Sequence, residues 1–156
     1  MANGNYIQKI DTFDSFQQNW PFLLEGLAVL RSSIGGNMPD MTEDEFFKML
    51  LMMALEPERG IIMMLCSKNG KPLGYIAIHD ITNWYAPKRA NVYAIYSNSK
   101  CPSTLTELAF EGRKWGKEQG FKYVQACSFR FTGAAQRLFE RKLGLHQRYI
   151  VYESEV

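Results

Sequence analysis

Apolar residues recur along the first part of the chain with the spacing of helices. Between residues 12 and 33 they return every three or four positions, which predicts an amphipathic helix with an N-cap at Asp11 or Thr12 and a bend at Pro21. The apolar positions are Phe13, Phe16, Trp20, Leu23, Leu24, Leu27 and Leu30. A second apolar stripe follows the Thr-Glu-Asp-Glu run at 42–45, whose spacing is that of a capping box, so a second helix is predicted behind it.

Shorter apolar runs separated by turn residues predict strands. Two of these runs are joined by Asn69-Gly70, the dipeptide that favours a tight hairpin turn. Six strands are predicted in all, at 6–10, 61–66, 73–80, 91–96, 121–129 and 149–153. Two further helices are predicted at 104–119 and 133–142. The element order is therefore β-α-α-β-β-β-α-β-α-β.

This order predicts an α/β (α+β) fold in one domain spanning residues 1–156. The three middle strands form an antiparallel meander, and a right-handed crossover makes the fourth and fifth strands parallel. The expected sheet is mixed and mostly antiparallel, with helices on both faces. A chain of 156 residues has the usual length of one domain.

Charge is unevenly divided along the chain. Residues 1–60 carry four Lys/Arg against nine Asp/Glu, whereas residues 61–156 carry fourteen against seven. The basic part favours an anionic ligand such as a nucleotide, coenzyme A or nucleic acid, although solvated helix faces explain the same charges. No nucleic-acid-binding motif accompanies the basic residues, so nucleic acid is not an expected partner.

Cysteine usage and hydropathy restrict the class of protein further. The three cysteines stand far apart, with no Cys-x-x-Cys pair and no His/Cys spacing for zinc, so no metal is expected. The most apolar stretch, at 49–55, is too short to cross a bilayer. We see no signal peptide at the start, and a cytoplasmic protein without membrane contact is the expectation.

Three segments carry a resemblance to a known family. Segment 69–76 is similar to a family hairpin with two glycines four residues apart, and segment 92–105 lies where that family has its fourth strand and pyrophosphate loop. Segment 132–145 is similar to an Asn-x-x-Ala-x-x-x-Tyr-Glu-Lys-x-Gly-Phe motif. With the element order, these segments resemble the GNAT superfamily of acetyl-CoA-dependent N-acetyltransferases over nearly the whole chain.

The resemblance implies that acetyl-CoA binds as the cosubstrate, with its pyrophosphate at the N–H groups that open the helix near residue 103. The implied cofactor-binding residues are Ile95, Lys100, Ser103, Thr104, Leu105, Thr106, Thr132, Ala135 and Phe139. The chain departs from the family pattern because no glycine lies between 100 and 106, and because Phe139 stands where the family has a proton-donating tyrosine. If Thr104 is the N-cap, Glu107 closes a capping box beside the proposed phosphates.

The same resemblance implies that a backbone N–H near the end of the fourth strand polarises the thioester carbonyl. By register this is the amide of Ile95 or Tyr96. His79 is a candidate general base because of its ordinary pKa, and Asp80 is an alternative. A partly exposed histidine at a strand end is the more common explanation of such a residue, and Tyr93 or Tyr96 is a candidate for positioning a water molecule.

The resemblance also implies that the amine acceptor binds between the first two helices and the loop before the fourth strand. Trp84, Tyr85 and Tyr93 are the candidate acceptor-binding residues. Two functions remain open: N-acyl transfer to a primary amine, and a module that binds coenzyme A or a protein partner without turnover. An uncovered last strand at 149–153 further predicts a homodimer.

Overall fold

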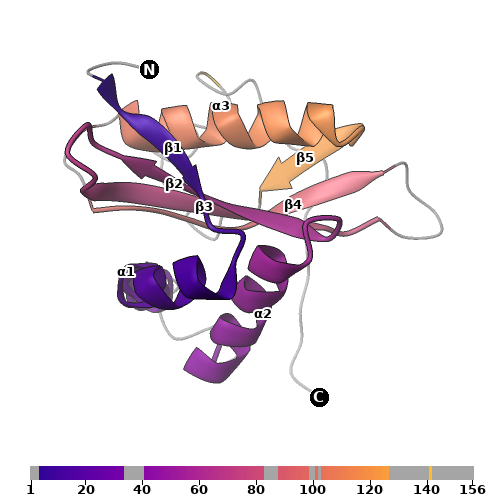
Figure 1. Cartoon of the computed structure of the whole chain (residues 1–156). Coiled ribbons are helices and arrows are strands. Elements are labelled where there is room, and N and C mark those ends of the chain that lie inside the picture. Colours follow the sequence, from indigo (N-terminus) through magenta and orange to yellow (C-terminus); the bar gives the residue numbers. More distant parts are fainter. Residues whose placement is uncertain are drawn as a thin grey trace.

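The computed structural model describes residues 4–33, 41–82, 88–98, 101, 103–126 and 141 (Figure 1). Along the chain they form β1 (Tyr6–Lys9), α1 (Phe13–Ser33), α2 (Glu43–Leu55), β2 (Gly60–Cys66), β3 (Pro72–Asp80), β4 (Arg89–Ser97), α3 (Ser103–Glu118) and β5 (Tyr123–Ala126). The predicted element order is confirmed as far as the fifth strand. The predicted helix at 133–142 and strand at 149–153 lie outside the described residues.

The five strands form one sheet in the order β1-β2-β3-β4-β5. The pairs β1-β2, β2-β3 and β3-β4 are antiparallel, whereas the pair β4-β5 is parallel. The predicted mixed sheet is therefore confirmed. At the hairpin between β2 and β3, Gly70 has a φ of 79°, which a residue with a side chain rarely adopts, and this explains the glycine of the Asn-Gly turn.

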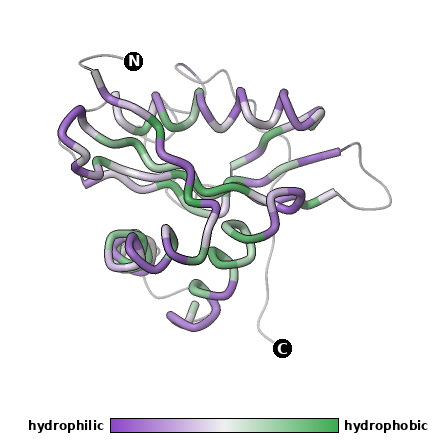
Figure 2. The backbone as a smooth tube through the Cα atoms, in the orientation of Figure 1, coloured by the Kyte–Doolittle hydropathy of each residue, from purple (hydrophilic) through white to green (hydrophobic). Residues whose placement is uncertain are grey.

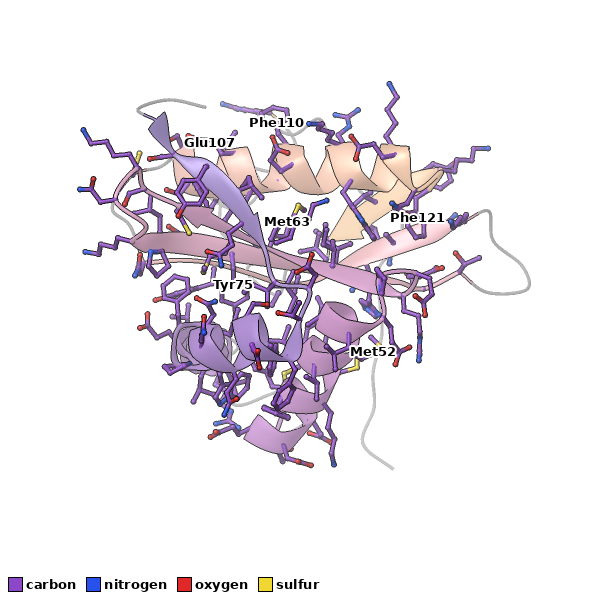
Figure 3. The ribbon with its side chains drawn as sticks, in the orientation of Figure 1. Met52, Met63, Tyr75, Glu107, Phe110 and Phe121 are labelled. Carbon is purple, nitrogen blue, oxygen red and sulfur yellow. The ribbon has the colours of Figure 1, made fainter. Side chains whose placement is uncertain are left out.

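Helices cover both faces of this sheet, as the sequence predicts. Figure 1 shows α1 and α2 on one face and α3 on the other. Alternate residues of a strand point to opposite faces, so each face has its own core. In Figure 3, Tyr75 lies on the side of α1 and Met63 on the side of α3. Hydrophobic residues concentrate along the strands between these layers (Figure 2).

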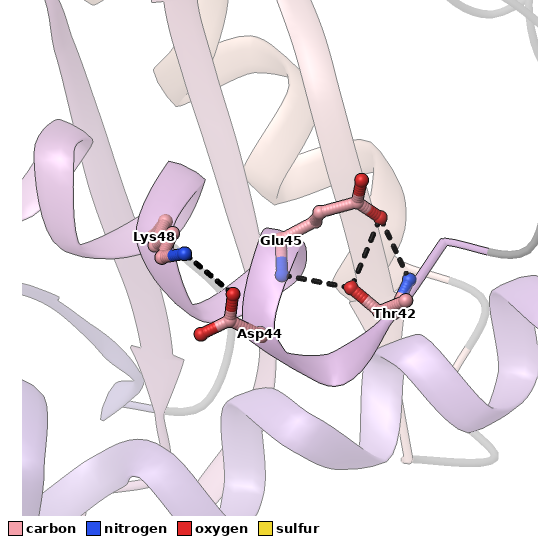
Figure 4. A network of polar contacts seen from close by, with 4 residues as sticks. All are labelled: Thr42, Asp44, Glu45 and Lys48. Carbon is pink, nitrogen blue, oxygen red and sulfur yellow. Dashed lines mark hydrogen bonds and ion pairs between the residues drawn. The ribbon is translucent and has the colours of Figure 1, made fainter.

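Side-chain caps fix the beginnings of the first two helices. The Thr12 hydroxyl accepts the Ser15 N–H at 3.1 Å, and Thr42 accepts the Glu45 N–H at 3.1 Å. Glu45 in turn accepts the backbone N–H of Thr42 at 2.9 Å, which completes the predicted capping box (Figure 4). Each cap satisfies backbone donors that have no partner inside the helix.

Candidate active site

A bulge in β4 shapes the centre of the candidate site. Ala77 of β3 pairs with Ala94. The next residue of β3, Ile78, pairs with Val92, so that Tyr93 is an additional residue in β4. Such a residue bends the strand and increases its twist. As a result Tyr93 and Ala94 both pack in the core beneath α1 and α2.

The backbone beyond the bulge has a defined direction. In a strand, the N–H and C=O groups of one residue point to the same side, and those of the next residue point to the other side. The carbonyl oxygen of Tyr96 faces β3, because it lies 2.5 Å from the place that a Cβ on Gly74 would take. Asn98 also faces β3, since its N–H donates to the Leu73 carbonyl at 3.2 Å. The amide of Ile95 therefore points to the other side, where β5 is the neighbour.

The parallel pairing with β5 covers the first part of β4. Within the described residues it runs from Arg89 opposite Tyr123 to Val92 opposite Ala126. Ile95 lies three residues beyond the last of these pairs. Of the two amides considered from the sequence, the alternation of the strand favours Ile95 over Tyr96 as a donor for an oxygen atom bound at this edge.

Helix α3 begins against the end of β4. Gly74, opposite Ser97 in the ladder, leaves room for this approach. A Cβ on Gly74 would come within 2.9 Å of Cγ2 of Thr104 and 3.2 Å of Cδ1 of Leu108. The first turn of α3 thus lies directly on β3 and β4, on the face opposite α1 and α2 (Figure 1).

The side chains in the first turn of α3 differ in their exposure to solvent. Ser103 is exposed, whereas the Thr104 side chain is 1% exposed. The helix begins at Ser103, so Thr104 stands inside the first turn and not at the N-cap, and it donates its N–H to the Cys101 carbonyl at 3.2 Å. Leu105 and Thr106 are half-buried. The polar groups that this turn exposes are therefore its backbone N–H groups and the Ser103 hydroxyl.

One carboxylate stands close to this turn. Glu107 follows Ser103 by four residues, roughly 6 Å along the helix axis. Its Oε2 atom is buried without a hydrogen-bond partner among the described residues. Figure 3 shows Glu107 near the beginning of α3. Its negative charge opposes the binding of an anion at the same helix start.

An exposed thiol precedes the helix. The Cys101 sulfur lies 3.0 Å from the Ser103 hydroxyl oxygen. Hydrogen bonding from Ser103 lowers the pKa of the Cys101 thiol. Cys101 is thus a titratable group next to the proposed diphosphate turn.

Six of the site residues predicted from the sequence lie outside the described residues. They are Trp84, Tyr85, Lys100, Thr132, Ala135 and Phe139. Their roles stay predictions.

His79 faces the layer formed by α1 and α2. Its Nε2 lies 3.4 Å from Nδ2 of Asn91, and its ring meets the Tyr93 ring edge to face, with centroids 5.8 Å apart. Burial lowers the pKa of His79, and the nearby Asp80 charge opposes this shift. The imidazole is consequently neutral at pH 7, which is the form that a proton acceptor requires.

Tyr93 is held over α2. Its ring stacks on Phe46 with centroids 5.9 Å apart, and its hydroxyl donates to Sδ of Met41 at 3.5 Å. Burial and, to a lesser degree, the Glu45 charge raise the pKa of Tyr93. Since sulfur is a weak acceptor, the Tyr93 hydroxyl has capacity for a stronger hydrogen bond.

Tyr96 reaches across to α1. Its hydroxyl donates to Oε2 of Glu25 at 2.8 Å, and its ring packs on Phe22 and Tyr75 with centroids 5.6 and 5.8 Å away. Burial, and then the hydrogen bond to Glu25, raise the pKa of Tyr96 to about 12. Glu25 is therefore a polar member of the site that the sequence patterns did not identify. An isolated acid inside the apolar run of residues 22–30 was the available signal.

The structure separates the predicted site residues into two groups. His79, Tyr93 and Tyr96 lie on the face of α1 and α2, and the turn at 103–106 lies on the face of α3. Ile95 stands in the strand between them. Strand β4 thus separates the two groups of residues.

Neither a metal centre nor a membrane span is found in the described part of the chain. No group of three or more His, Cys, Asp and Glu is placed there to hold a metal ion. None of the described helices has the length and apolar character needed to cross a bilayer.

No protein-family model matches this sequence, and no curated protein sequence is significantly similar to it. Solved structures do match its fold. A possible acetyltransferase from Clostridium difficile 630 has 14% identity and a TM-score of 0.72, and the match covers 97% of each chain.

Two further matches were solved with bound ligands. An aminoglycoside acetyltransferase from an uncultured soil metagenomic sample, solved with sisomicin, has 12% identity and a TM-score of 0.70 over 99% of this chain and 97% of the other. AAC(6')-Iy, solved with a coenzyme A bisubstrate analogue of neamine, has 12% identity and a TM-score of 0.66 over 97% and 99%. The chain thus has the fold of GNAT-type acetyltransferases, as the sequence resemblance implies.

Proposed function

We propose that this protein is an N-acyltransferase that moves an acetyl group from acetyl-CoA directly to a primary amine. The fold supports the proposal, and the related AAC(6')-Iy structure holds a coenzyme A analogue. Fold similarity alone does not define a reaction, so the proposal rests mainly on the bulge in β4. With this bulge the Ile95 amide points away from β3, and α3 begins against the end of the same strand.

The cosubstrate would be held on the face of α3. The N–H groups that open an α-helix have no partner within it and carry a partial positive charge, which suits a diphosphate. Ser103, exposed at this turn, adds a hydroxyl. Gly74 allows the turn to approach the sheet closely, so the bound molecule would lie next to β4. Bound acetyl-CoA supplies the activated acetyl thioester.

Ile95 would stabilise the charge that develops on the carbonyl oxygen during attack. A backbone N–H can do this without any particular side chain, because it is fixed by the strand. On the other face, neutral His79 would accept a proton from the amine, directly or through water. Tyr93 would position that water with a hydroxyl that is now bonded only to a weak acceptor among the described residues.

Release of the coenzyme A thiolate needs no tyrosine in this proposal. Phe139 has no proton to donate, so another source is required. The Cys101 thiol, whose pKa is lowered by Ser103, is the candidate beside the α3 turn.

Calorimetric titration with acetyl-CoA and with free coenzyme A tests the cosubstrate site. We expect saturable binding, a melting temperature that rises with ligand concentration, and release of free thiol when primary amines are added. Absence of binding at millimolar acetyl-CoA would contradict the proposal.

A second function is favoured by Phe139 and by the glycine-free turn at 100–106. In this alternative the chain binds coenzyme A or a protein partner without turnover. Saturable acetyl-CoA binding with no thiol release across a broad amine panel would support the alternative over the transferase.

A further inference from the structure

The contact between α1 and β4 contains a carboxylate that forms no ion pair with another described residue. Glu25 is exposed, and its Oε2 accepts the Tyr96 hydroxyl at 2.8 Å. The two ion pairs within the described residues are formed elsewhere, by Lys48 with Asp44 and by Arg59 with Glu56. In the described part of the chain, no Lys or Arg therefore neutralises Glu25.

Aromatic rings surround the group that holds this carboxylate. The Tyr96 ring packs against Phe22 and Tyr75, with centroids 5.6 and 5.8 Å away. Phe22 is 8% exposed and Tyr75 is fully buried, so these rings hold the Tyr96 ring in place and present no open face. The attraction for an organic cation therefore comes from the charge of the carboxylate that Tyr96 orients. The Tyr96 hydroxyl fixes one oxygen of Glu25 and leaves the lone pairs of the other oxygen as acceptors.

The surrounding layer has the same sign of charge. The first 60 residues, which include α1 and α2, carry four Lys/Arg against nine Asp/Glu. The first turn of α2 alone contributes Glu43, Asp44 and Glu45. An excess of acidic residues in this part of the chain favours a cationic over an anionic ligand.

Glu25 is not adjacent to the Ile95 amide, where the reaction is proposed. Tyr96 directly follows Ile95, and consecutive Cα atoms lie about 3.8 Å apart. The Tyr96 side chain then extends from the strand to Glu25. A cation bound at Glu25 thus lies about one tyrosine side chain away from the Ile95 amide. The nitrogen that attacks and the nitrogen that Glu25 binds are consequently different atoms of one acceptor.

We propose that Glu25, oriented by Tyr96, binds a second ammonium group of the acceptor, so that the preferred acceptors are diamines or larger polycationic amines. This inference rests on the proposed acyl transfer for the identity of the acceptor site. Glu25 acts in it as a specificity residue, and its carboxylate takes no part in bond formation.

Calorimetry with 1,4-diaminobutane and with 1-aminobutane tests the inference, each alone and in the presence of coenzyme A. We expect the diamine to bind wild-type protein at least about tenfold more tightly than the monoamine, which corresponds to about 1.4 kcal/mol. Glu25→Gln should remove this preference by weakening diamine binding more than monoamine binding. Tyr96→Phe should reduce it partly, because the carboxylate keeps its charge but loses its orientation.

Glu118→Gln, an exposed change on α3, is the matched control and should keep the full preference. Equal binding of the two amines to wild-type protein, an unchanged preference in Glu25→Gln, or no diamine binding would each overturn the inference. Acetyl-CoA titrations of the same preparations separate the two proposals. Failure of acetyl-CoA to bind counts against acyl transfer, whereas loss of the diamine preference alone counts only against the role of Glu25.

Discussion

Tyr75 ties the first helix to the sheet. Its side chain is fully buried, and its hydroxyl donates to the backbone carbonyl of Leu23 in α1 at 2.8 Å. Gly26 makes this contact possible, since a Cβ there would lie 2.0 Å from the Tyr75 oxygen. Desolvation raises the pKa of Tyr75, so the hydroxyl remains a donor at all physiological pH values. One glycine and one tyrosine therefore set how closely α1 approaches β3.

Gly26→Ala should destabilise the protein by about 1–3 kcal/mol, as overpacking of a core usually does. In an exposed helix interior the same change would stabilise by roughly 1 kcal/mol, so the sign itself is informative. Urea unfolding at pH 7 measures the free energy of unfolding. In a Tyr75→Phe background the penalty should be smaller, because the closest clashing atom is gone. A stabilised Gly26→Ala protein would show that the ring moves aside freely.

His79 gives the proposed reaction a defined pH dependence. Because burial lowers its pKa below the ordinary value of about 6.5, kcat/KM should rise with pH and level off below neutrality. His79→Gln should lower kcat by roughly 10²-fold or more and remove this acidic limb. The chain has two histidines, and His146→Gln serves as the control. An unchanged acidic limb in His79→Gln would assign the proton acceptor elsewhere.

At the scale of elements, the beginning of α2 couples stability to pH. Hydrogen bonds from the backbone and hydroxyl of Thr42 lower the pKa of Glu45. A carboxyl group whose pKa is lower in the folded state contributes stability above its unfolded pKa, roughly 4.3, and loses it as pH falls through the folded value.

Glu45→Gln should therefore lose part of the stability measured at pH 7 and show a smaller decrease between pH 5 and pH 3 than wild-type protein. The glutamine oxygen still accepts the Thr42 N–H, but without charge assistance. Thermal unfolding followed by circular dichroism across this range measures the effect. Glu58→Gln, in the turn after α2, is the control and should follow the wild-type curve. Parallel curves for all three proteins would show that Glu45 does not cause the pH dependence.

The beginning of α3 carries an opposing charge that a single substitution can remove. Glu107 lies about one helical turn from the exposed Ser103. Glu107→Gln should tighten coenzyme A binding by about two- to fivefold at low salt, because a screened like charge costs a fraction of a kcal/mol to about 1 kcal/mol. Glu118→Gln, at the far end of the helix, should change the Kd little. Weaker binding in Glu107→Gln would instead give this carboxylate a positive role in the site.

At the scale of the molecule, the sheet separates two chemical environments. The layer of α1 and α2 is acidic and aromatic, and the layer of α3 presents a helix start. The two meet at the bulged strand β4. This arrangement suits a cationic acceptor on one face and an anionic cosubstrate on the other, which is why the reaction is proposed at the edge between them.

Oligomerisation is the prediction that belongs to the whole molecule. The strand predicted at 149–153 lies outside the described residues, so the homodimer stays a prediction from the sequence. Light scattering at micromolar protein concentration measures the mass in solution. A dimer of about twice the chain mass is expected, and a monomer would contradict the prediction.

Much of the described fold follows from local patterns in the sequence. Apolar residues at three- and four-residue steps predicted α1 and α2, and Asn69-Gly70 predicted the hairpin between β2 and β3. Thr42 and Glu45 formed the expected capping box. These signals are local because each depends on residues within one turn or one hairpin. For the same reason the predicted boundaries differ from the structure by only a few residues.

The candidate site depended on contacts that no local pattern contains. Tyr96 and Glu25 are 71 residues apart in the sequence, and their hydrogen bond exists only because α1 packs beneath β4. The bulge at Tyr93 shifts the register of β4 by one residue, so that the Ile95 amide, and not the Tyr96 amide, is the proposed donor. The sequence by itself determined the elements, their order and the family resemblance, since these arise from short-range periodicity and turn chemistry. Only the tertiary structure decided which side chains and amides share the site, because strand register and helix docking are settled by packing across the whole sheet.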